Sequence, residues 1–171
     1  MKSRAVRARV FFHILMLILV FLMQSLPHFM PRIGGVYPLL LIPAVVCIGM
    51  FERELIGGFL GLFAGVLWDI TSLRIAGFHA VLLLVIGCAC GLMVIHLMRN
   101  SLLSAILLTF FSLLFYELCN WIFFYVLAGK EMLGYQLVHF ALPRLAYSLV
   151  FTLPFYLLSR AAVKRMRREK A

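Results

Sequence analysis

Charged residues are scarce in this sequence: Asp, Glu, Lys and Arg together make up 13% of 171 residues, and only six residues are acidic. Water-soluble domains carry about 25% charged and about 45–50% apolar residues. Here 65% of the residues are hydrophobic and the mean hydropathy is +1.09. The shortage of charge excludes a soluble globular domain and predicts an integral membrane protein.

Motifs of common catalytic sites are also missing. The sequence has no H-E-x-x-H, no phosphate-cradling glycine loop, no nucleophile motif and no acidic metal cluster. Paired carboxylates can do acid and base work, and Asp69, His79, Glu117, His139 and Arg144 all fall in the outer half or the middle of the predicted bundle. Embedded polar residues serve packing more often than catalysis, so we predict a protein that is not an enzyme and holds no cofactor.

Cysteine and histidine are few and scattered. Cys47, Cys88, Cys90 and Cys119 lie inside predicted spans and form no C-x-x-C pair, so we expect them to be small buried apolar residues. The five histidines are divided between the two ends of the predicted bundle and show no ligand spacing. The sequence therefore predicts neither a disulfide nor a metal site.

Long apolar runs are abundant, and a helix of roughly 20 residues crosses a hydrocarbon core about 30 Å thick. Six runs are predicted spans: Val10 to Leu26, Tyr37 to Phe51, Leu55 to Leu73, Gly77 to Met98, Leu102 to Ala128, and Val138 to Ser159. Pro43 should kink the second helix because it removes a backbone hydrogen bond, whereas Pro38 fits a first helical turn. We expect one all-α transmembrane domain of residues 1–171, a bundle of six helices with a basic tail at 160–171.

The basic residues predict the orientation, since those in short flanking segments stay in the cytoplasm. With six spans, twelve Lys and Arg lie on the side of both termini and three on the other, Arg144 being intramembrane. The first run is expected to be a retained helix, because "QSLPHFMPRIGG" after it offers no A-x-A cleavage pattern. Both termini are thus predicted to be cytoplasmic.

The net charge of +10 is mostly this topology signal. Near anionic lipids, each basic residue of the tail is worth about 1 kcal/mol, so anionic membrane lipids are expected partners. A cytoplasmic protein partner for the tail remains an alternative. No folded basic domain accompanies the tail, which argues against nucleic-acid binding.

The stretch "GGFLGLFAGVLWDITSL" places Gly57, Gly61, Gly65 and Asp69 four residues apart. Residues at this spacing form a gently slanting stripe on one face of an α-helix. Helices in lipid associate closely across small residues, so the stripe predicts a groove for another helix. That helix belongs either to this chain or to a partner.

Three ionisable residues are predicted inside the membrane: Asp69 near the outer end of its span, Glu117 near the middle, and Arg144 between them in depth. Ionised groups there are costly unless they are paired. We hypothesise that Arg144 pairs with Asp69 or Glu117 and fixes the register of three helices. Asn120, one turn from Glu117, is a further candidate for this intramembrane polar network.

The spacing Gly61-x3-Gly65-x3-Asp69-x7-Gly77, written "GLFAGVLWDITSLRIAG", resembles the core pattern of the bacterial rod shape-determining protein MreD family. Length, number of spans, basic ends and the early "YPLLLIP" extend the resemblance over the whole chain. Arg74 departs from it, because a small or neutral turn residue is expected there.

The resemblance implies a non-enzymatic inner-membrane component of the machinery that inserts peptidoglycan along the side wall. The implied partners are the bitopic scaffold protein MreC, the glycosyltransferase RodA with its penicillin-binding transpeptidase, and the actin-like filament protein MreB. The implied fold is similar to the six-helix substrate-binding subunit of energy-coupling-factor vitamin transporters. Our hypothesis is that the glycines supply a packing surface, while Asp69 and the "TSLRIAG" turn ending at Gly77 shape an outer rim where MreC docks.

A vitamin-binding subunit of an energy-coupling-factor transporter is the alternative function, with a pocket closed by outer loops. Trp68, Trp121 and Tyr125 could supply an aromatic platform for a ring ligand. The first helix lacks the A-x-x-x-A surface that such subunits use to engage the coupling subunit, and the outer loops are short. These two features favour the scaffold.

Overall fold

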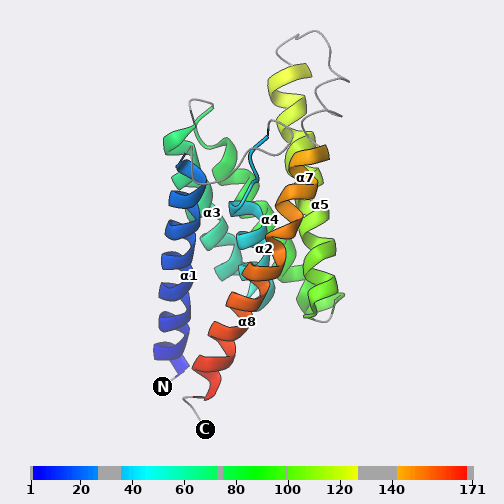
Figure 1. The fold of residues 1–171 in the computed structure, drawn as a ribbon. Helices are drawn as coiled ribbons and strands as arrows, with labels where there is room; N and C mark the ends of the chain where they lie inside the picture. Colours follow the sequence, from blue (N-terminus) through cyan, green and yellow to red (C-terminus); the bar gives the residue numbers. More distant parts are fainter. Residues whose placement is uncertain (1, 27–35, 73–74, 99, 127–141, 169–171) are drawn as a thin grey trace.

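The computed structural model describes residues 2–26, 36–72, 75–98, 100–126 and 142–168. His139, Arg74, the side chain of Tyr125 and the predicted span ends at 127–128 and 138–141 lie outside the described residues. The described part is an all-helical bundle (Figure 1). Its elements are α1 (Lys2–Ser25), α2 (Leu41–Phe51), α3 (Glu54–Thr71), α4 (Phe78–His96), α5 (Leu102–Trp121), the π-helical turn η1 (Ile122–Val126), α7 (Leu142–Val150) and α8 (Thr152–Arg168).

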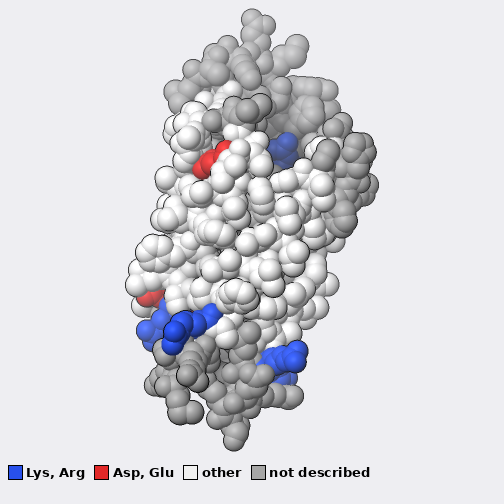
Figure 2. All heavy atoms as spheres, turned by 90° about the vertical axis from the view of Figure 1, so that its left-hand side faces the viewer, with Lys and Arg blue, Asp and Glu red and all other residues white. Residues whose placement is uncertain are grey.

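Among the described residues, five helical stretches are long and apolar enough to cross a membrane: Val6–Ser25, Glu54–Thr71, Phe78–His96, Leu102–Phe124 and Leu142–Arg165. They agree with the prediction of a multi-pass membrane protein. The start of α1 and the end of α8 lie at the same end of the bundle, which we call the terminal end; the opposite end is the distal end (Figure 1). On the face shown in Figure 2, Lys and Arg side chains gather towards the terminal end.

The second helix, α2, forms the centre of the bundle. Its residues Leu41 to Met50 are all buried, and it contacts α1, α3, α4, α5 and α8. A helix that is apolar on every side is suited to such a position. With 11 residues it is about 16 Å long, so the predicted span from Tyr37 is wrong in its first part: helix begins only at Leu41.

The predicted kink at Pro43 is also wrong. Pro43 is the third residue of α2, in the first turn, where a backbone N–H has no helical partner to lose. The break lies instead in the last predicted span, where α7 ends at Val150 and α8 begins at Thr152. Pro154 explains it, because its ring nitrogen cannot donate to the Val150 carbonyl and its ring crowds that group.

Candidate functional site

The glycine stripe of α3 faces α4 inside this chain. A Cβ atom added at Gly61 would collide with the carbonyl oxygen of Leu83, and one added at Gly65 would lie 2.6 Å from the backbone nitrogen of Ala80. Contacts below 3.0 Å to backbone leave no room for a side chain. The two helices therefore pack backbone to backbone along this stripe, as close small-residue contacts allow in membranes.

Gly57 extends the contact towards the terminal end. A Cβ atom there would lie 2.9 Å from the Cα atom of Gly49 in α2 and 3.1 Å from the carbonyl oxygen of Gly87 in α4. The contact is equally close from the other side, since a Cβ atom on Gly87 would collide with the Gly57 carbonyl. Three helices thus meet at their glycines, and the structure places the stripe against this chain's own helices.

Asp69, at the end of the stripe, holds the start of α4. Its Oδ1 accepts hydrogen bonds from the backbone N–H of His79 at 3.2 Å and from His79 Nδ1 at 2.7 Å, and its Oδ2 accepts from the Ala80 N–H at 3.0 Å. The first N–H groups of a helix lack intrahelical partners, and the helix dipole favours an anion beside them. Gly77, the N-cap of α4, has φ +88°, a left-handed conformation that suits glycine.

Three aromatic rings, those of His79, Tyr116 and Trp68, lie in contact with one another beside the Asp69 carboxylate. Because a carboxylate only accepts, His79 Nδ1 carries a proton, and Nε2 hydrogen-bonds with the Tyr116 hydroxyl at 3.1 Å. Trp68 stacks on the His79 ring with centroids 4.4 Å apart and lies 5.4 Å from the Tyr116 ring. The contacts join α3, α4 and α5 at the distal end.

Arg144 of α7 lies against Glu117 of α5, with Nη1 3.3 Å from Oε1. The Glu117 side chain is 9% exposed, and Asn120, one turn away, is also buried. Of the two partners that the sequence offered for Arg144, the structure has Glu117 in contact with it. Asp69 instead binds the start of α4.

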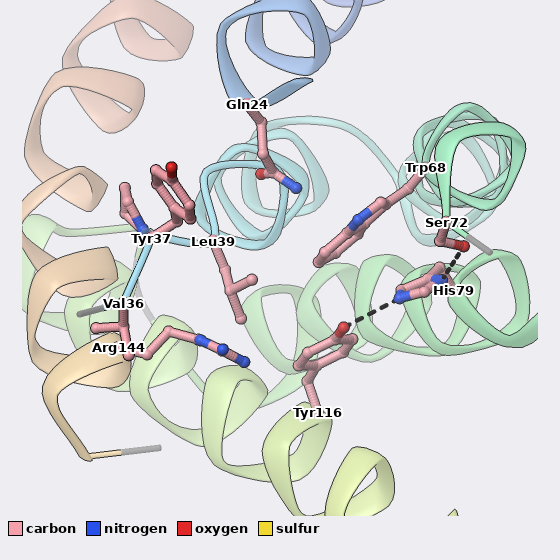
Figure 3. A pocket seen from close by; sticks show the side chains of 10 residues that line it. Gln24, Val36, Tyr37, Leu39, Trp68, Ser72, His79, Tyr116 and Arg144 are labelled. Carbon is pink, nitrogen blue, oxygen red and sulfur yellow. Dashed lines mark hydrogen bonds between the residues drawn. The ribbon is translucent and has the colours of Figure 1, made fainter. Parts of the chain in front are cut away.

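A cavity of about 380 Å³ opens between these groups, and we call it the distal cavity (Figure 3). It is lined by Gln24, Val36, Tyr37, Pro38, Leu39, Trp68, Ser72, His79, Tyr116 and Arg144. The lining side chains come from α1, α3, α4, α5 and α7 and from the segment before α2, and Figure 3 shows them around one space. The volume is within the range of small-ligand sites, about 300–1,000 Å³.

A family model described as rod shape-determining protein MreD matches residues 4–165. The chain belongs to the MreD family. Membership implies a role in rod-shape determination, and the family is one of non-catalytic membrane proteins. No curated protein and no solved structure shows a significant match to the chain.

In this MreD-family chain, sequence reasoning singled out Asp69 and Arg144 but missed Gln24 and Tyr116. Gln24 Oε1 accepts hydrogen bonds from the N–H groups of Leu40 and Leu41, so a residue of α1 caps the start of α2. Neither residue belongs to a spaced motif. Only the tertiary structure brings these two side chains to the distal cavity.

Within the described ranges of this MreD-family chain, no group of three or more His, Cys, Asp or Glu side chains has metal-site geometry. The four cysteines are free thiols, and Cys47 and Cys90 are buried in the helical core. The chemistry that the distal cavity offers is hydrogen bonding and aromatic contact.

Proposed function

We propose that the protein is a non-enzymatic scaffold of the cell-wall elongation machinery in the inner membrane. In this role it helps to control rod shape and lateral peptidoglycan synthesis by binding a bitopic scaffold protein of the MreC kind. The family match over residues 4–165 is the observation that carries the proposal. A RodA-type glycosyltransferase with its penicillin-binding transpeptidase joins the same assembly, and MreB-type filaments lie below the membrane.

The docking surface is the distal rim, which we define as residues 69–72 and 75–77. Asp69 holds the rim in place, because its carboxylate at the end of α3 accepts hydrogen bonds from backbone N–H groups at the start of α4. Two apolar side chains on the rim face outwards: Ile70 is 75% exposed and Ile75 is 57% exposed. A firmly held turn with exposed apolar side chains beside a cavity suits the membrane helix or juxtamembrane segment of a bitopic partner.

The orientation follows from charge. Exposed basic residues at the terminal end come from α1, the α2–α3 connection and α8: Arg7, Arg53, Arg160, Lys164 and Arg165. Basic residues mark the cytoplasmic face, so both termini lie in the cytoplasm and the distal rim faces outwards. The rim is then on the side where the wall is built.

Capture of a purified MreC-type protein by the tagged full chain tests the rim. Ile70→Ala combined with Ile75→Ala should weaken capture about fivefold or more, because truncating a buried interface anchor costs over 1 kcal/mol. Phe59→Ala is the matched control, since Phe59 is 68% exposed on the same helix but lies near its terminal end. Equal capture by all variants would place the docking surface elsewhere.

The distal cavity favours a second candidate, the vitamin-binding subunit of an energy-coupling-factor transporter. Trp68 supplies an aromatic ring in the cavity wall, beside polar side chains such as Ser72. An all-helical bundle with a cavity at one end of its described part supports a likeness to that subunit's fold. Saturable binding of a vitamin by the purified chain, together with co-purification of a paired ATPase, would support this candidate over the scaffold.

A further inference from the structure

The distal cavity is surrounded by hydrogen-bond donors for which the described part of the chain holds no acceptor. Gln24 is the first. Its Oε1 accepts from the Leu40 N–H at 2.8 Å and the Leu41 N–H at 3.1 Å, which fixes the orientation of the amide. The NH2 group therefore lies on the other side, towards the cavity, and makes no hydrogen bond to a described residue (Figure 3).

Arg144 supplies the second set of donors. Glu117 engages Nη1 alone, at 3.3 Å, although a guanidinium carries five N–H groups. The Nε atom is buried and has no acceptor among the described residues. The edge formed by Nε and Nη2, which binds oxyanions in a two-pronged manner, is thus left unused by Glu117. The side chain is 28% exposed, and it lines the cavity.

The third donor is the indole N–H of Trp68, which makes no hydrogen bond to a described residue. The ring itself is held by stacking on His79 and Tyr116, so its position does not depend on that N–H. Gln24, Trp68 and Arg144 belong to α1, α3 and α7, and Figure 3 shows the three side chains reaching from different directions towards one space.

The two nearby carboxylates are already in use. Asp69 receives three hydrogen bonds from the start of α4, and the N-terminal end of that helix stabilises its charge. Glu117 contacts Arg144. Neither carboxylate is thus left to serve the donors of Gln24, Trp68 and Arg144, and the matching ligand is a group rich in acceptors.

We propose that the distal cavity binds a phosphoryl group, carried by a lipid headgroup or by a small soluble phosphate. Donors from three helices suit a tetrahedral group, whose oxygens point in several directions, better than a planar carboxylate. The free edge of Arg144 matches a phosphate bidentately. Gln24 is the second-last residue of α1 and His79 the second residue of α4, so the site lies at the membrane boundary, where phosphate headgroups are found. This binding activity goes beyond the scaffold function and does not depend on it.

The test uses the purified full chain in dodecyl maltoside at constant ionic strength. Inorganic phosphate and phosphatidylglycerol are the two probes, and acetate is the carboxylate control. The Tm of the protein is measured at increasing probe concentration to detect saturable binding. Native mass spectrometry gives the number of bound lipid molecules. A saturable rise in Tm with phosphatidylglycerol alone supports the lipid source, and a rise with inorganic phosphate supports the soluble one.

Three variants assign the binding to the cavity. Gln24→Glu keeps an oxygen for the Leu40 and Leu41 N–H groups but replaces the free donor with a negative oxygen. Trp68→Phe keeps an aromatic ring for stacking but removes the indole N–H. Arg144→Lys keeps the positive charge but removes the planar guanidinium that binds a phosphate through two N–H groups. Each should weaken phosphate binding about tenfold, the scale of one charge-assisted hydrogen bond.

Arg160→Gln is the matched control, because Arg160 is an exposed cation at the terminal end. It should bind like the wild type. The proposal is overturned if neither probe binds, if acetate binds as well as phosphate, or if Arg160→Gln weakens binding while Gln24→Glu and Trp68→Phe do not. Since Gln24→Glu and Trp68→Phe retain the structural contacts, loss of folding in Arg144→Lys alone leaves the test decisive.

Discussion

At the scale of single residues, the carboxylate of Asp69 explains why a file of glycines ends in a charge. The glycines bring α3 close to α4, and the carboxylate then accepts the first backbone N–H groups of α4 together with His79 Nδ1. An anion with three donors at a helix N-terminus is stable without a cation beside it. The sequence-based hypothesis allowed Arg144 as its partner, because spacing along the chain does not show which helix end lies opposite.

Replacing Asp69 should lower the thermal stability of the purified protein. Loss of a helix cap costs about 0.5–2 kcal/mol, and Asp69→Ala removes both the cap and the His79 contact. Asp69→Asn keeps an acceptor oxygen and should lower Tm less. Thr71→Ala is the control, because the Thr71 hydroxyl bonds only to the Trp68 carbonyl one turn back, in an exposed position. A Tm of Asp69→Ala equal to that of Thr71→Ala would contradict the assigned role.

Glu52, in the connection between α2 and α3, makes stability depend on pH. Its side chain is 2% exposed, with Arg9 Nε and His13 Nδ1 each 3.6 Å from Oε1. Burial raises the pKa of Glu52 above its ordinary value of 4.5, and Arg9 opposes this only in part. A raised pKa in the folded state means that the contribution to stability is complete below pH 4.5 and is lost as pH rises through the folded-state pKa.

The matched variant is Glu52→Gln, which cannot ionise. Its Tm should equal or exceed that of the wild type at neutral pH, and the difference should shrink as the pH falls towards 4.5. For a chain of this size, each kcal/mol of difference in the free energy of unfolding corresponds to about 2–4 °C in Tm. Since His13 and Arg9 are unchanged in both proteins, the difference reports Glu52. A wild type that gains stability over Glu52→Gln as pH rises would show that the ion pair with Arg9 dominates.

At the scale of helices, the α3–α4 contact is the tightest constraint on the fold. A leucine at Gly61 has no space beside the Leu83 carbonyl, and overpacking a well-packed contact costs about 1–3 kcal/mol or more. Gly61→Leu should therefore reduce the yield of monodisperse protein on size exclusion. Phe59→Leu, at an exposed position of the same helix, should leave it unchanged. Folded Gly61→Leu that fails only in partner capture would instead assign the stripe to docking.

Apolar run length predicted most helices, because a membrane span needs a long uninterrupted apolar segment. Run length did not predict helix ends that depend on contacts with other parts of the chain. The predicted span starting at Tyr37 begins as helix only at Leu41, since Gln24 of α1 and Ser148 of α7 bind the preceding backbone. A proline also has different effects at different helix positions: Pro43 is tolerated in a first turn, whereas Pro154 separates α7 from α8.

At the scale of the whole molecule, α2 is enclosed by five neighbouring helices, and the polar groups near the distal end line one cavity. The residue types in that cavity were visible in the sequence, but their meeting was not. Gln24 and Arg144 are 120 positions apart in the sequence, and no periodicity links them. Family membership supplies the cellular role that such geometry alone does not specify.

The central claim is that the chain acts as a scaffold for wall elongation. Its most direct test tags the C-terminus, solubilises native membranes gently and quantifies the co-purifying proteins by mass spectrometry, beside the Ile70→Ala, Ile75→Ala and Phe59→Ala variants. The account predicts an MreC-type protein and wall synthases with the wild type and Phe59→Ala, and their depletion from the rim double variant. Recovery of a pair of ATPases with a transmembrane coupling subunit, and no wall-synthesis protein, would contradict it.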